Sequence, residues 1–491
     1  MEIMQERAIY FLSFCLLLCS GCVSPEKNPK ENDARPNLLI VFPDEMRTQT
    51  MGFLGLEPVL TPNIDQFAKE GLYLAEAVSN YPLCSPFRAM FMTGKYPHKN
   101  GVVSNCNSAR PHNELSISDT CWSDILSNNG YSLGYIGKWH LDAPHEPYVD
   151  TYNNSPERNI KWNEWCPPER RHGFDFWYAY GTYDRHMNPM YWSTDADRDG
   201  FHYVNEWGPI HEADIAIDYI NNKDGSYRNE KDPFALVVSM NPPHTPYNQV
   251  PDKYLKLYEN LNVDSLANRP DIDPKSKWSN HFMQNVIPYY AMVSGVDEQF
   301  GRIVNALDKN GLSENTIVIF MSDHGCNLGM HGQPTKNNPY EVSMRIPFII
   351  RYPSIIASGA TDLMLSVPDI YPTILDLVGL GDIIPTTVQG RSFAPFLSEG
   401  ISDSVPESQI YMKMNYNRPE VGARGIRTMR YTMSMNYTSE GIIDTVLFDN
   451  LKDQFQVKNI ADIRPELVSS LLEKLQMEMK EIDDPAYPYF N

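Results

Sequence analysis

Four apolar segments of the chain end in side chains that can hold a cation or move a proton. Each segment has the length of a buried strand and passes directly into acids, histidines or a lysine. The segments and their terminal groups are 37–45 with Asp44 and Glu45, 131–140 with Lys138 and His140, 234–244 with His244, and 315–325 with Asp323 and His324.

The acids among these groups point to a metal. The carboxylates of Asp44, Glu45 and Asp323 are hard oxygen ligands, the kind that Ca²⁺ and Mg²⁺ prefer. Two adjacent carboxylates repel each other unless a cation or a proton separates them. The alternative for Asp44 alone is that it caps the turn after its strand. The second acid beside it and the distant pair of Asp323 and His324 favour a metal site.

The stretch YPLCSPFRAMFMTG places a single cysteine at the start of an expected helix. Pro86 fits the first turn of a helix through residues 87–93, which Gly94 ends. Cys84 is therefore expected just ahead of the helix N-terminus, where free amides favour negative charge. Arg88 follows four residues later and can approach the same place, which suits a sulfate or phosphate. A buried structural cysteine and a catalytic thiolate are the alternatives.

The segments between the four strands have helical spacing. Residues 61–71, 118–130 and 289–311 carry apolar side chains at intervals of three and four. Strands that alternate with such helices predict an α/β fold, with a large, mostly parallel sheet sandwiched by helices. Because ligands bind at the carboxyl ends of parallel strands, the four sets of polar groups are expected at one edge.

The end of the chain has a different pattern, with short alternating segments followed by a helical one. These segments are 409–416, 422–437 and 444–450, expected as antiparallel strands, and 464–482, expected as a helix. We therefore predict a catalytic domain over residues 36–404 and a smaller C-terminal α+β domain, which carries an antiparallel sheet, over residues 405–491.

The first residues have the features of an export signal. Residues 8–18 are apolar but far short of the roughly 20 residues that a membrane-spanning helix needs. They run into LCSGC, which resembles a bacterial lipoprotein processing site and implies cleavage before Cys22 and lipidation of that thiol. We expect a signal peptide over residues 1–21, a flexible tether over 22–35, and an exported lipoprotein of the cell envelope, on its periplasmic or cell-surface face. A plain secretory signal is the alternative.

Charge and cysteine content exclude several kinds of partner. The formal net charge of -21 argues against nucleic acid, and it argues against a membrane surface except through the lipid anchor. An anionic substrate would need a focused cationic pocket. The five cysteines beyond the leader are too few for a disulfide scaffold, and a Cys106–Cys121 bridge is left open.

The residues from Cys84 to Arg88, continuing to Thr93 and Gly94, resemble the signature of type I sulfatases, in the alkaline-phosphatase-like superfamily. In that family the cysteine is oxidised after translation to formylglycine, whose hydrated aldehyde is the nucleophile. The resemblance extends over nearly the whole mature chain. It includes the segments NLLIVFPDE, GKWHL, MNPPHTPY, IVIFMSDHG, RIPFIIRYP and LFDNLKDQFQVKNIAD.

The resemblance implies a sulfatase in which formylglycine at position 84, formed by a maturation enzyme, attacks the sulfur of a sulfate ester. It implies a divalent metal, with Ca²⁺ expected and Mg²⁺ the alternative, and cations around the sulfate. His244 is the candidate general acid for the departing alcohol and His140 the group that helps to expel sulfate, although the two roles could be exchanged. The implied metal ligands are Asp44, Glu45, Asp323 and His324, and the implied cations are Arg88, Lys138 and Lys336.

An envelope lipoprotein needs an external substrate, so a sulfated carbohydrate is expected. His331, on a Gly-rich segment near Lys336, is a candidate substrate contact. So are Arg185 and His186, in an aromatic run over residues 174–192 that could give sugars a flat apolar face. Two other functions are open: a phosphonate or phosphodiester hydrolase with the same signature and sheet, and a catalytically inactive glycan-binding lipoprotein.

Overall fold

The structure is a computed structural model and describes residues 35–152, 158–400, 405–438 and 440–490. The predicted signal peptide, most of the predicted tether and Cys22 lie outside the described residues. From Arg35 onward the chain packs as one compact unit.

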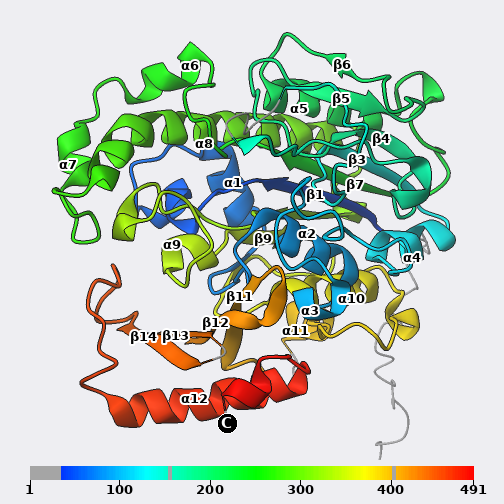
Figure 1. Cartoon of the computed structure of the whole chain (residues 1–491). Coiled ribbons are helices and arrows are strands. Elements are labelled where there is room, and N and C mark those ends of the chain that lie inside the picture. The colour runs from blue at the N-terminus through cyan, green and yellow to red at the C-terminus, as the bar shows by residue number, and fades with distance from the viewer. Residues whose placement is uncertain (1–34, 153–157, 401–404, 439, 491) are drawn as a thin grey trace, which may run out of the picture. The chain divides into compact units, whose positions relative to one another are not determined.

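The four predicted strands lie next to one another at the centre of the main sheet (Figure 1). All are parallel and every one of their residues is buried, as expected of apolar runs that are covered on both faces. Their carboxyl ends therefore meet at one edge. In spatial order the strands are β8 (Thr316–Met321), β1 (Asn37–Pro43), β7 (Phe234–Met240) and β3 (Ser132–Lys138).

Six shorter strands extend this sheet on its two sides. Antiparallel pairs occur only among these additions and where β9 joins β8, so the sheet is parallel at its centre and mixed at its edges. Beyond β8 lie β9 (Phe348–Arg351), β2 (Leu72–Leu74) and β10 (Gly359–Thr361), and beyond β3 lie β4 (Phe176–Tyr180), β5 (Met190–Ser193) and β6 (His202–Tyr203).

Helices cover both faces of the main sheet, as predicted. Alternate residues of β1 point into two different cores: Leu38 and Ile40 into one, Leu39 and Val41 into the other. The first core includes side chains from α2 (Cys84–Thr93), α4 (Trp122–Asn128) and α10 (Val367–Leu377). The second includes side chains from α1 (Pro62–Glu70), α5 (Gly208–Ile220) and α8 (Lys277–Lys309).

Shorter helices complete the described part of the fold. None of the helices in the described residues is both long enough and apolar enough to span a bilayer. The short helices are α3 (Pro97–Asn100), α6 (Asp252–Leu255), α7 (Val263–Ala267), α9 (Glu341–Met344) and α11 (Ala394–Glu399).

The C-terminal residues form the predicted antiparallel sheet, which packs against the first core together with its helix. The segment 422–437 is two strands rather than one, because the chain turns at Met429 and Arg430. The elements are β11 (Ser408–Asn415), β12 (Arg418–Thr428), β13 (Tyr431–Thr438), β14 (Gly441–Asp449) and α12 (Pro465–Glu481).

The five described cysteines are free, so a Cys106–Cys121 bridge is not formed. The Cys106 thiol instead accepts a hydrogen bond from the Asn113 amide at 3.7 Å, and Cys121 caps the N-terminus of α4. Hydrophobic packing, not disulfide bonding, therefore holds the described fold together, as the low cysteine content indicated.

A buried glutamic acid links α5 to strands β4 and β5. Glu212 is 1% exposed, and its Oε1 accepts hydrogen bonds from the hydroxyls of Tyr191 at 3.1 Å and Tyr180 at 3.4 Å. Burial raises the pKa of Glu212 to about 8. The neutral acid is therefore the favoured form in the folded protein at neutral pH.

The Glu212→Gln variant should resist alkaline pH better than the parent protein. Because the pKa of Glu212 is higher in the folded than in the unfolded chain, its stabilising contribution is fully present below the unfolded pKa and is lost as the pH rises through about 8. Unfolding measured at about pH 5 and about pH 9 should show the parent losing a few kcal/mol relative to the variant. If the difference in unfolding free energy between the parent and the variant is the same at both pH values, Glu212 is not a neutral, buried acid.

Candidate active site

Helix α2 places Cys84 where the ends of the central strands meet. The helix begins at Cys84 itself, whereas the sequence predicted that Cys84 lies just ahead of it. It can begin two residues before Pro86 because backbone nitrogens in the first turn have no intrahelical acceptor to lose. The Cys84 sulfur lies 3.7 Å from Asp44 Oδ1 and 3.4 Å from His324 Nε2.

Three completely buried carboxylates follow strands β1 and β8: Asp44, Glu45 and Asp323. The backbone amide of Glu45 donates a hydrogen bond to Asp323 Oδ1 at 3.0 Å, which joins the ends of β1 and β8. Burial and the neighbouring Asp44 carboxylate raise the pKa of Asp323 to about 7. Within the described part of the chain, Glu45 Oε1 has no hydrogen-bond partner.

This donor set fits a divalent cation. Four ligand atoms lie within 4.8 Å of one another, and Glu45 and His244 form a second such group with Asp44. Buried carboxylates that repel each other need positive charge nearby, and the unpartnered Glu45 oxygen offers a free ligand atom. The residues of the first group are Asp44, Cys84, Asp323 and His324.

Three cationic side chains complete the cluster. Arg88 NH2 lies 3.1 Å from Asp44 Oδ2 and 3.4 Å from Asp323 Oδ2, and Lys138 Nζ lies 2.7 Å from Asp44 Oδ2. Lys336 Nζ lies 3.0 Å from Glu45 Oε2. Burial opposes the charge of Lys138, but the neighbouring acidic groups, Asp44 foremost, together raise the pKa of Lys138 above its usual value. Arg88, Lys138 and Lys336 are thus charged hydrogen-bond donors of the kind that bind the oxygens of an oxyanion.

Two polar residues at the end of β7 hold these cations in place. Ser239 Oγ accepts a hydrogen bond from Arg88 NH1 at 2.8 Å, and Asn241 Oδ1 accepts one from Lys138 Nζ at 3.0 Å. Neither residue was predicted, although both lie in segment 234–244, which ends in His244. Their signal is the same as that of His244: polar side chains at the carboxyl end of a buried strand.

His140 and His244, the two candidate proton-transfer groups, differ in their hydrogen bonds. His140 Nε2 donates to the Cys106 carbonyl at 3.0 Å, and its buried Nδ1 has no partner among the described residues. Burial lowers the pKa of His140, so this imidazole is neutral with a free lone pair. His244 Nδ1 donates to the Thr245 carbonyl at 2.7 Å, and its Nε2 lies 3.5 Å from Glu45 Oε2.

Asp184 lies beside His244 and was missed by sequence analysis. Its Oδ1 is 3.4 Å from His244 Nδ1 and accepts a hydrogen bond from the Asn241 amide at 3.2 Å. Burial would raise the pKa of Asp184, but the positive charges of His244 and Lys138 hold it well below its usual range. Asp184 comes from the loop between β4 and β5, where no strand-end pattern marks it.

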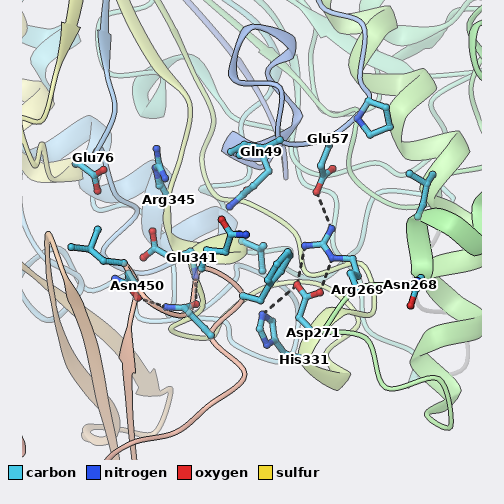
Figure 2. Close-up of a pocket in the computed structure, with 18 of the residues that line it drawn as sticks. Gln49, Glu57, Glu76, Asn268, Arg269, Asp271, His331, Glu341, Arg345 and Asn450 are labelled. Atoms are coloured by element: carbon cyan, nitrogen blue, oxygen red, sulfur yellow. Dashed lines mark hydrogen bonds and ion pairs between the residues drawn. The ribbon is translucent and has the colours of Figure 1, made fainter.

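Of the three predicted substrate contacts, the structure places His186 beside His244, Arg185 on the surface and His331 in a separate pocket (Figure 2). His186 is buried, and its Nε2 donates to the His244 carbonyl at 2.9 Å. Arg185 is exposed and stacks on the Tyr152 ring at 3.8 Å. His331 stacks on the Tyr340 ring and lines a separate pocket. Substrate contact stays a prediction for all three.

An α/β sheet that gathers buried carboxylates, Cys84 at a helix N-terminus and three cations at one edge has the features of a hydrolase of sulfate or phosphate esters. The chain belongs to the sulfatase family: the Sulfatase model matches residues 36–380, and the model of the N-sulphoglucosamine sulphohydrolase C-terminal region matches residues 329–484. This membership agrees with the resemblance found in the sequence.

Individual relatives match over nearly their whole length. The chain is 41% identical to an endo-4-O-sulfatase of Bacteroides thetaiotaomicron, with 96% of this chain and 97% of the relative covered. It is 33% identical to an ulvan-active sulfatase of Formosa agariphila, with 96% and 86% covered. The structure of yidJ from Bacteroides fragilis superposes with a TM-score of 0.88 at 46% identity, with 93% and 98% covered.

The Asp184→Ala variant should turn over substrate more slowly with little change in KM, because Asp184 positions His244. We expect a loss in kcat of roughly 10- to 100-fold, below the largest effects of a general acid–base group itself. Steady-state kinetics at saturating substrate measure it, and the exposed Asp199→Ala variant serves as control. An unchanged kcat would show that His244 does not need this carboxylate.

Proposed function

We propose that this sulfatase removes 4-O-sulfate groups from within the chains of a sulfated glycan, with a formylglycine at position 84 and Ca²⁺ as its metal. The observation that carries the proposal is the position of Cys84 at the N-terminus of α2, between buried carboxylates and cations. The substrate part is supported by a near full-length relative named as an endo-4-O-sulfatase.

Sulfatases generally use a formylglycine, which supplies an oxygen nucleophile, and a divalent metal, which polarises the sulfate. The oxygen-rich donor set suits Ca²⁺, with Mg²⁺ as the alternative. Because Cys84 is only 1% exposed, the enzyme that oxidises it must reach this thiol before the fold closes. The residues that would hold the metal are Asp44, Glu45, Asp323 and His324.

The cations of the chain bind the sulfate. Arg88, Lys138 and Lys336 can each turn a donor toward the sulfuryl oxygens and neutralise their charge while negative charge shifts to the leaving oxygen as its bond to sulfur breaks. Overall, the sulfate ester and water become an alcohol and sulfate. The site is buried except near Lys336, His244 and Asp184, whose side chains are 9%, 12% and 20% exposed. The glycan must therefore extend outward past these residues.

This geometry supports the predicted roles of the two histidines. His244 lies on the solvent side, where the leaving alcohol must depart, and Asp184 stabilises its protonated form, so it donates the proton to that oxygen. His140 lies on the buried side, and its Nδ1 has no partner among the described residues. His140 would therefore accept the proton of the remaining hydroxyl of residue 84, and the loss of this proton expels the sulfate. The two roles are therefore distinguished by the Asp184 carboxylate, which lies beside His244.

The location of the protein stays a proposal from its N-terminal sequence. A lipoprotein on the cell envelope would meet polysaccharides that do not enter the cytoplasm. The membrane contact would be made by the lipid on Cys22 alone, since the chain carries a formal charge of -21.

Sulfate release from a polysaccharide with 4-O-sulfate groups tests this function directly. The mature protein should release sulfate while the length of the glycan stays the same, and the Cys84→Ala variant should release none. The Cys166→Ala variant, which removes another buried free cysteine, is the matched control. Hydrolysis of a phosphate ester in preference to the sulfate ester would contradict the proposal.

Removal of the metal should abolish activity and lower the melting temperature. A chelator removes one of the positive charges that offset the three buried carboxylates, so the folded state is destabilised relative to the metal-bound form. Added Ca²⁺ should restore both properties, and the same concentration of Mg²⁺ should restore them less. Full activity after dialysis against chelator would contradict a metal-dependent site.

A further inference from the structure

His140 is the proton acceptor of the proposed mechanism, so the reaction depends on where its imidazole lies. The residue is only 2% exposed, and Nδ1 has no partner among the described residues. Burial lowers the pKa of His140, and the neighbouring Cys84 side chain opposes this lowering. The imidazole thus lies beside residue 84, where a proton transfer from that residue requires it.

The backbone of His140 has an unusual conformation. Its φ angle is 54°, in the left-handed region that residues with a side chain rarely adopt. Such a conformation persists only where the surrounding structure holds it. Because the backbone determines where the imidazole points, contacts to the backbone of this residue also position Nδ1.

The hydroxyl of Ser85 makes such a contact. It donates a hydrogen bond to the His140 carbonyl at 2.8 Å and accepts one from the Cys106 amide at 3.1 Å. The Cys106 carbonyl in turn accepts the hydrogen bond from His140 Nε2 at 3.0 Å. Three hydrogen bonds therefore join Ser85, Cys106 and His140 in a closed ring. This ring holds both the carbonyl and the imidazole of the histidine.

Within the described residues, no other group can replace this hydroxyl. Ser85 is completely buried, and its hydroxyl is the one hydrogen-bond partner that the described residues provide for the His140 carbonyl and for the Cys106 amide. Without it, both backbone groups would be buried and unpaired, which is unfavourable. The backbone of residue 140 would then move to recover a hydrogen bond.

The residues on either side of His140 are held by other contacts. The Trp139 amide donates to the Tyr180 carbonyl at 2.8 Å, and the Leu141 carbonyl accepts from the Leu115 amide at 2.9 Å. The side chains of both neighbours are buried in the first core. Loss of the serine hydroxyl should therefore turn the histidine between two fixed neighbours and leave the rest of the loop in place.

We propose that Ser85 is a positioning residue for the step that expels sulfate. The proposal rests on the proposed function, since this step requires a formylglycine at position 84. The O–H bond of the remaining hydroxyl of residue 84 breaks, its proton goes to Nδ1 of His140, and its electron pair forms a C=O bond. The C–O bond to sulfate breaks at the same time, and sulfate leaves with that electron pair. Ser85 acts through His140, because it holds Nδ1 where the proton arrives.

Steady-state kinetics of the Ser85→Ala variant test the proposal, on protein whose aldehyde at residue 84 is checked by the mass of the tryptic peptide Glu70–Arg88. A displaced His140 slows the step that follows departure of the alcohol. We expect kcat and KM to fall together by roughly tenfold, with kcat/KM unchanged, because kcat/KM reports only the steps up to that departure. In samples quenched during turnover, more of residue 84 should carry sulfate than in the parent.

The Ser79→Ala variant is the matched control. Ser79 is also completely buried, but its hydroxyl has no partner among the described residues. The control should keep the kinetic constants of the parent. Melting temperatures check that both variants are folded.

Nitrogen NMR of the histidine side chains gives a second measurement, which does not depend on oxidation of Cys84. In the full-length parent and in the control, His140 should carry its proton on Nε2, because this nitrogen donates to a carbonyl. In the Ser85→Ala variant both tautomers should be populated. A His140→Gln variant assigns the signal. If the Ser85→Ala variant is not oxidised at residue 84, the tautomer decides the question.

The proposal is overturned if His140 has the same single tautomer in the Ser85→Ala variant as in the control. It is also overturned if the variant has the kinetic constants of the parent, or if kcat/KM falls while no additional sulfate remains on residue 84. Either result with a parent that releases sulfate would overturn the role of Ser85 alone. A parent that releases no sulfate would instead overturn the proposed function.

Discussion

The mutual neutralisation of buried charges at the carboxyl edge of the sheet is the interaction on which the rest of the structure depends. Asp44 and Asp323, which have no solvent exposure, lie against the guanidinium of Arg88, and Asp44 also lies against the ammonium of Lys138; both cations are 1% exposed. The third buried carboxylate, Glu45, pairs with Lys336. Removal of one partner from a buried pair typically destabilises a protein by about 3–5 kcal/mol. Asp44 and Asp323 come from the ends of the neighbouring strands β1 and β8, whereas Lys138 reaches Asp44 from the end of β3, across β7.

The same charges set up the chemistry. An anionic substrate approaches a protein with a formal charge of -21, so the attraction must come from the local cluster and not from the overall field. Lys336 stands at the mouth of this cluster, where its side chain is 9% exposed. The helix start at Cys84 adds the partial positive charge of free backbone amides. A divalent metal held by these carboxylates would add a further positive charge to the site.

The sequence predicted the parts of the fold that have continuous apolar runs. The four central strands are long, fully buried and bounded by polar residues, so both their type and the side of the sheet that carries the site followed from pattern alone. Asp184 could not be predicted in this way because it lies in an irregular loop, where its direction depends on tertiary packing. Similarly, His331 lies near Lys336 along the chain, yet it stacks on Tyr340 in a separate pocket, because neighbours in a loop need not point the same way.

The most direct test of the central claim, that residue 84 is the nucleophile of this sulfatase, is the mass of the tryptic peptide Glu70–Arg88. The peptide should come from active protein, made in its own host or together with a maturation enzyme. Our account predicts the mass of an aldehyde in place of the thiol at position 84. An unmodified cysteine in protein that releases sulfate at full rate would contradict it, and would show that the thiol itself, or another group, attacks the ester.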